Sequence, residues 1–178
     1  MKGRTKNLWQ KLFNVPFLRK NFRNMRFEEQ IIFLAQLVTL LGCFLPWVSV
    51  KPTVFGQPYY YTAFSGTTSV LGFFVFFMSS IVTVFFLEKI WQKKWIKIPI
   101  KTQTILHSAN IQSLILLVSA WSVFMQIEKA TSVVSTSFGW FLCFFAQIAT
   151  IVAHFLATQN YKKQTVEDFF INKQSNEQ

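Results

Sequence analysis

Charged residues are missing from four long stretches of this sequence, and their absence decides the class of protein. Lys, Arg, Asp and Glu together make up 14% of the 178 residues, whereas about a quarter is usual for a soluble domain. Acidic residues are scarcest: there are seven, and all lie outside the four uncharged stretches. The composition therefore argues against a soluble domain and for a chain that lies largely in lipid.

Each uncharged stretch is long enough to cross a membrane as a helix. About 20 mainly apolar residues, at a rise of 1.5 Å each, span a hydrocarbon core of about 30 Å. A single charge at the centre of such a helix costs about 2.5–3.5 kcal/mol, so four uncharged windows indicate four spans. The predicted spans are residues 30–50, 68–87, 104–127 and 138–158.

Positive charge is distributed unevenly between the connections. Residues 1–29 contain eight Lys or Arg, residues 88–103 contain five and residues 159–178 contain three, so 16 of the 18 lie on one side of four spans. Cytoplasmic segments carry the excess of Lys and Arg, which predicts that both termini are cytoplasmic. The net charge of +11 is thus an orientation signal, and its division among three short segments argues against a nucleic-acid surface.

The short connections predict an all-α fold, an integral membrane antiparallel four-helix bundle. Residues 1–29 form a basic segment, residues 30–158 the transmembrane domain, and residues 159–178 a polar tail that is expected to fray. The predominance of Lys over Arg, with many Phe, Ile and Asn, indicates an AT-rich genome. It favours a bacterial plasma membrane.

Aromatic and basic residues alternate in the predicted cytoplasmic segments next to the spans. Such a pattern is typical of helices that lie in the headgroup layer, with aromatics towards the hydrocarbon and Lys or Arg towards anionic lipid. A plain basic tail is the alternative for the N-terminal segment. The candidate lipid or partner contacts are Trp9, Arg19, Lys20, Trp91, Lys93, Lys94 and Trp95.

Three consecutive tyrosines, Tyr59, Tyr60 and Tyr61, lie in the connection on the opposite side. Tyrosine is enriched at membrane interfaces, so an aromatic belt is preferred here over a ligand-binding surface. Residues 54–55 and 59–62 are able to pair as a small hairpin around Gly56.

Each span carries one stripe of polar or small residues at helical spacing. Such stripes are expected to face one another in lipid, because small residues let helices approach and polar residues hydrogen-bond across them. The stripes are Gln36, Thr39, Cys43 and Trp47; Gly72, Ser79 and Thr83; Ser108, Gln112, Ser119, Ser122 and Gln126; and Cys143, Gln147, Thr150 and His154.

Catalytic motifs are absent from the sequence: there is no glycine-rich phosphate loop, zinc-protease motif, carboxylate pair within a span or Ser/His/Asp spacing. No catalytic residue, metal site or cofactor is predicted. Polar residues at membrane depth are nevertheless candidate functional residues. The predicted polar cluster consists of Gln36, His107, Asn110, Gln147, Thr150 and His154.

The two histidines of this cluster, His107 and His154, lie at matching depths in the third and fourth spans. The preferred interpretation is structural, with each imidazole hydrogen-bonded to a neighbouring helix or to headgroups. Proton or ion handling and the ligation of a haem by both rings are the alternatives, whereas two histidines are too few for zinc. For Cys43 and Cys143, buried free thiols are preferred over a disulfide.

The end of the first span carries one recognisable pattern. Residues 41–48 read LGCFLPWV, and Phe64-Ser65-Gly66 and a glycine-containing span follow. This order resembles a G-x-FLPW…SG pattern of small bacterial four-transmembrane proteins. Those proteins have no established activity, so the resemblance implies a membrane fold and no reaction.

The uncharged spans and abundant Phe favour a non-enzymatic integral membrane subunit or scaffold. Its expected partners are membrane lipids and other membrane proteins or further copies of itself, without nucleic acid. A small transporter or channel component lined by the polar stripes is the alternative, and a haem-binding membrane electron carrier is the second alternative.

Overall fold

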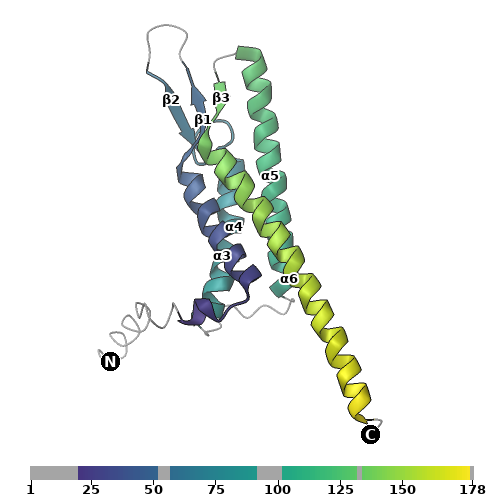
Figure 1. Ribbon diagram of the computed structural model, residues 1–178. Coiled ribbons are helices and arrows are strands. Elements are labelled where there is room, and N and C mark those ends of the chain that lie inside the picture. The colour runs from purple at the N-terminus through teal and green to yellow at the C-terminus, as the bar shows by residue number, and fades with distance from the viewer. Residues whose placement is uncertain (1–19, 52–56, 92–101, 132–133, 177–178) are drawn as a thin grey trace, which may run out of the picture.

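The computed structural model describes residues 20–51, 57–91, 102–131 and 134–176. Within them, four helices are long and apolar enough to cross a membrane, and they lie side by side (Figure 1). The chain is therefore a multi-pass integral membrane protein by helix length and composition. The helices are α3 (Phe27–Phe44), α4 (Ser69–Trp91), α5 (Thr102–Thr131) and α6 (Phe138–Asn176).

Helix α3 ends at Phe44, before the predicted end of the first span at Val50. Leu45 is extended (φ −82°, ψ 158°), because the residue before a proline avoids the helical region and Pro46 cannot continue the helix. The Gly42 carbonyl near the helix end accepts from the backbone N–H of Leu45 (3.2 Å) and from the indole of Trp47 (3.0 Å).

A small antiparallel sheet lies beyond the ends of α3, α4 and α6 and beside the end of α5 (Figure 1). Its strands are β1 (Pro46–Val50), β2 (Tyr59–Thr62) and β3 (Val134–Thr136), in the order β2-β1-β3. The prediction of an all-α chain misses this sheet. Strand β2 pairs with β1, and residues 54–55 of the predicted hairpin lie outside the described residues. Valine and tryptophan are common in strands as well as in membrane helices. Hydropathy alone therefore assigned the residues of β1 to the first span.

Helix α3 packs chiefly against α6, and α4 chiefly against α5. Helix α6 continues beyond the other helices at the end remote from the sheet (Figure 1). The polar tail that was expected to fray is therefore helical to Asn176.

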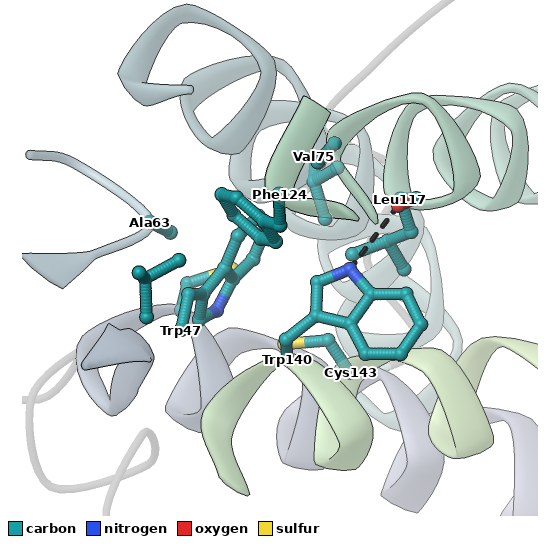
Figure 2. Packing of buried hydrophobic residues seen from close by; sticks show 10 residues of the cluster. Trp47, Ala63, Val75, Leu117, Phe124, Trp140 and Cys143 are labelled. Atoms are coloured by element: carbon teal, nitrogen blue, oxygen red, sulfur yellow. Dashed lines mark hydrogen bonds between the residues drawn. The ribbon is translucent and has the colours of Figure 1, made fainter. Parts of the chain in front are cut away.

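Two apolar clusters fill the interior, one near each end of the helices. The cluster beneath the sheet contains Trp47, Val75, Leu117 and Trp140, and the Trp140 indole donates to the Leu117 carbonyl (3.1 Å; Figure 2). The cluster at the remote end contains Ile32, Val82, Phe86, Ala109 and Ala153. Between the two clusters lies a group of buried polar side chains.

Candidate functional site

The buried polar layer is built from every one of the four helices. Its side chains are fully or almost fully buried, and the pairs from α3 and from α6 each lie one turn apart on their helix. They are Gln36 and Thr39 of α3, Ser79 of α4, Asn110 of α5, and Gln147 and Thr150 of α6.

Gln36 joins three helices in this layer. Its amide Nε2 donates to Asn110 Oδ1 of α5 (3.0 Å) and to Thr150 Oγ1 of α6 (3.1 Å). Thr150 in turn donates to the Ala146 carbonyl one turn back in its own helix (3.0 Å). Hydrogen bonds between helices are the main directional contacts available in lipid, so Gln36 fixes the rotation of α3 against its neighbours.

Gln147 makes the corresponding contacts nearer the sheet. Its Nε2 donates to Ser79 Oγ of α4 (3.1 Å) and to Thr39 Oγ1 of α3 (3.4 Å). Together the two glutamines bring residues of all four helices into one hydrogen-bonded layer. The stripes predicted on the first, second and fourth spans are buried.

The layer retains unused hydrogen-bonding capacity. Within the described chain, Gln36 Oε1, Asn110 Nδ2 and Gln147 Oε1 are buried and have no hydrogen-bond partner. An unpaired buried polar atom costs about 1–3 kcal/mol.

The structure places the two histidines against each other at the remote end of this layer. The rings of His107 and His154 are stacked, with centroids 5.0 Å apart and planes 24° apart. His154 is buried, one turn beyond Thr150, whereas His107 is exposed at the edge of α5. The faces of the rings meet, which leaves no gap between them for a haem. In the described part of the chain no three His, Cys, Asp or Glu side chains gather into a metal site.

The two cysteines lie beside the layer, nearer the sheet. Both are fully buried and free, and Cys143 Sγ donates to the Thr39 carbonyl (3.5 Å). The thiols act here as small packing groups between α3 and α6.

The polar stripe predicted to face inward on the third span lies on the outside of α5, and this prediction is wrong. Ser108, Gln112, Ser119, Ser122 and Gln126 are all exposed. The opposite face of α5 is the buried one and carries Ala109, Asn110, Ser113, Leu117, Ala120 and Phe124. Both faces contain polar residues, so periodicity alone could not show which one turns inward.

No other spanning helix presents such a face. Within their spans, the exposed side chains of α3 are Phe27, Leu34, Leu41 and Phe44, and those of α4 before its final turn are Val70, Phe73, Phe74 and Phe77. The exposed side chains of α6 from Phe138 to Leu156 are likewise apolar. Lipid chains are a suitable environment for these three apolar faces. The outer face of α5 carries hydrogen-bonding groups, and lipid chains cannot hydrogen-bond them.

Contacts at the remote end tie α3 to α4 and α6. Lys89 of α4 forms an ion pair with Glu29 of α3 (2.6 Å), and Asn160 of α6 donates to Glu28 (2.6 Å). Both contacts are exposed, and exposed pairs contribute at most about 1 kcal/mol. They assist the packing of the spans without determining it.

Some of the predicted interfacial residues belong to the described part of the chain, at both ends of the helices. Lys20 is exposed, and the side chain of Trp91 is half-buried at the end of α4. Tyr59, Tyr60 and Tyr61 are exposed on β2, at the opposite end. The other predicted contacts lie outside the described residues: Trp9, Arg19, Lys93, Lys94 and Trp95.

Comparison with protein-family models, curated proteins and solved structures finds no match for this chain.

Proposed function

We propose that the chain is a non-enzymatic subunit or scaffold of a membrane protein complex, formed by an antiparallel four-helix bundle with both termini in the cytoplasm. The bacterial plasma membrane is the compartment that fits its composition. Aromatic and basic segments on the cytoplasmic side contact lipid headgroups, while the spans contact partner proteins.

The observation that carries this proposal is the polar stripe on the outer face of α5, where Ser108, Gln112, Ser119, Ser122 and Gln126 are exposed beside apolar side chains. A helix that touched only lipid would have an apolar outer face, as α3, α4 and α6 have. Polar side chains that project outward from a span usually contact another protein or a cavity, because lipid chains cannot accept or donate hydrogen bonds. The outer face of α5 is thus suited to contact another membrane helix.

Purification in mild detergent followed by native mass spectrometry tests the proposal. We expect a species heavier than the 20.8 kDa chain with a fixed composition. The substitution Gln112→Leu should reduce its abundance, whereas Phe145→Leu, on the apolar outer face of α6, should not. A chain that is monomeric in every mild detergent, with unchanged behaviour of both variants, would contradict the proposal.

The transporter alternative has one observation in its favour, the unpaired amide atoms of the buried polar layer. A polar solute that crossed between the helices would find donors and acceptors there. Its test is solute or ion flux in proteoliposomes, with Gln36→Leu compared with the native chain. The stacked histidines give the haem alternative no comparable support.

A further inference from the structure

One row of exposed residues on α5, five of them polar and one an isoleucine, follows a spacing that points to a specific kind of contact. Along the exposed face the intervals alternate between four and three residues, which is the heptad spacing of helices that pack along a continuous seam. The residues of this seam are Ser108, Gln112, Ile115, Ser119, Ser122 and Gln126. We refer to them as the α5 seam. Every one of them is exposed, so the seam faces away from the chain's own helices.

We propose that the α5 seam is the interface with a second copy of this chain, packed α5 against α5. This proposal rests on the proposed function as a membrane subunit and names its partner. The three serines of the seam are small enough to let two helix backbones approach closely, as helix pairs in membranes require.

The depth of Gln112 in the membrane distinguishes the seam from a polar surface that water or lipid headgroups could solvate. The candidate span of α5 is Thr104–Glu128, and at 1.5 Å per residue Gln112 lies about 6 Å from its middle. That depth is well inside a hydrocarbon core of about 30 Å. The Ser119 hydroxyl donates to the Ile115 carbonyl in its own helix (2.9 Å), whereas no described residue hydrogen-bonds the Gln112 amide.

A second copy of the chain supplies a hydrogen-bond partner for the Gln112 amide, because an amide both donates and accepts. Copies of one chain insert with the same orientation, so two α5 helices related by a two-fold axis along the membrane normal are parallel. Residues of the seam then meet their equivalents at equal depth. Gln112 of one copy is therefore placed to hydrogen-bond Gln112 of the other.

Photo-crosslinking in native membranes tests this interface without replacing any residue of the seam. Val118 is exposed beside the seam, and Val118→p-benzoylphenylalanine places a reactive ketone at its edge. We expect a product of about twice 20.8 kDa whose peptides all come from this chain. The matched control is Phe145→p-benzoylphenylalanine, since Phe145 is exposed on α6 at a similar depth, and it should yield no such product.

A second substitution tests whether Gln112 holds the interface. Gln112→Leu in the photo-crosslinking chain should reduce the association constant of the dimer about three- to tenfold, given what one hydrogen bond between membrane helices contributes. Gln112→Asn, which keeps an amide, should retain more of the dimer. Because Gln112 is exposed and unpaired within its own chain, the melting temperature of the monomer should stay the same in both variants.

The outcomes separate this inference from the proposed function. A crosslink from position 118 to a different protein would overturn self-association and leave the subunit role intact. Lipid adducts alone would overturn both. A self-crosslink that Gln112→Leu leaves unchanged would overturn the seam as the interface.

Discussion

A buried amide in a membrane helix is stabilised by the partners it finds on neighbouring helices. Gln147 is fully buried and donates to Ser79 and Thr39, whereas Phe145, on the same helix, is 63% exposed. Gln147→Leu should therefore lower the free energy of unfolding in detergent by about 0.6–2 kcal/mol per lost hydrogen bond. Phe145→Leu should change it little. Thermal unfolding of the two variants measures the difference.

The comparison between these variants controls for helix, depth and expression. If Phe145→Leu were the damaging change, the outer face of α6 would be buried against another protein in the purified complex. The same measurement on the monomeric fraction would separate that contact from an internal one, because a partner contact disappears with the partner.

The stacked histidines allow a second prediction at the residue scale. His107 is exposed, and His154 lies at the edge of the buried layer. If their role is structural, the double variant His107→Gln and His154→Gln should fold and cost about 1 kcal/mol per residue, since glutamine still hydrogen-bonds. Circular dichroism and melting temperature check this. A haem absorption band in the native protein that either single variant abolished would refute the structural role.

At the scale of elements, the β-hairpin docks on the first turn of α4 through a glycine. A Cβ placed on Gly72 would lie 2.0 Å from the Ala63 carbonyl oxygen, and because that atom is backbone, no side-chain rotation can relieve the clash. Gly72→Ala should destabilise the chain by about 1–3 kcal/mol or more. The control is Val70→Ala on the exposed side of the same turn. Equal melting temperatures for the two variants would mean that the hairpin does not dock there.

The elements also show which features hydropathy can predict. Long uncharged runs predicted helices that cross a membrane, and the described part of the chain contains four helices long and apolar enough to do so. The same signal extended the first span to Val50, because Trp47, Val48 and Val50 are as apolar in a strand as in a helix. The break was readable locally, since Leu45 precedes Pro46 and a proline ends a helix.

Helix α5 shows where helical periodicity stops being informative. Two polar faces lie on opposite sides of this helix, one with Asn110 and Ser113 and one with Gln112 and Ser119. A helical wheel identifies both faces without ranking them. The choice depends on Gln36, which reaches Asn110 from another helix. Tertiary packing, which the sequence of α5 alone does not contain, therefore decided which stripe became buried.

At the scale of the whole molecule, polar groups occupy two separate places. One is the layer in the middle of the helices, where glutamines of α3 and α6 hydrogen-bond all the neighbours. The other is the outer face of α5. The first accounts for how the four helices hold one another, and the second is the surface on which our proposal places a partner. An assembly through α5 would leave the apolar faces of α3 and α6 to lipid.

Orientation in the membrane is the property on which the molecular proposal depends, and it is still a prediction. If Lys and Arg hold the termini in the cytoplasm, the sheet lies outside. An impermeant thiol reagent applied to intact cells should then label Gln57→Cys, which is exposed beside β2, and leave Lys163→Cys, exposed on α6, unlabelled. The native chain is the control, because Cys43 and Cys143 are fully buried.

Labelling at residue 163 with protection at residue 57 would reverse the orientation, and the basic segments would then face away from the anionic cytoplasmic leaflet. The α5 seam would survive such a reversal, since two copies with the same orientation still meet at equal depth.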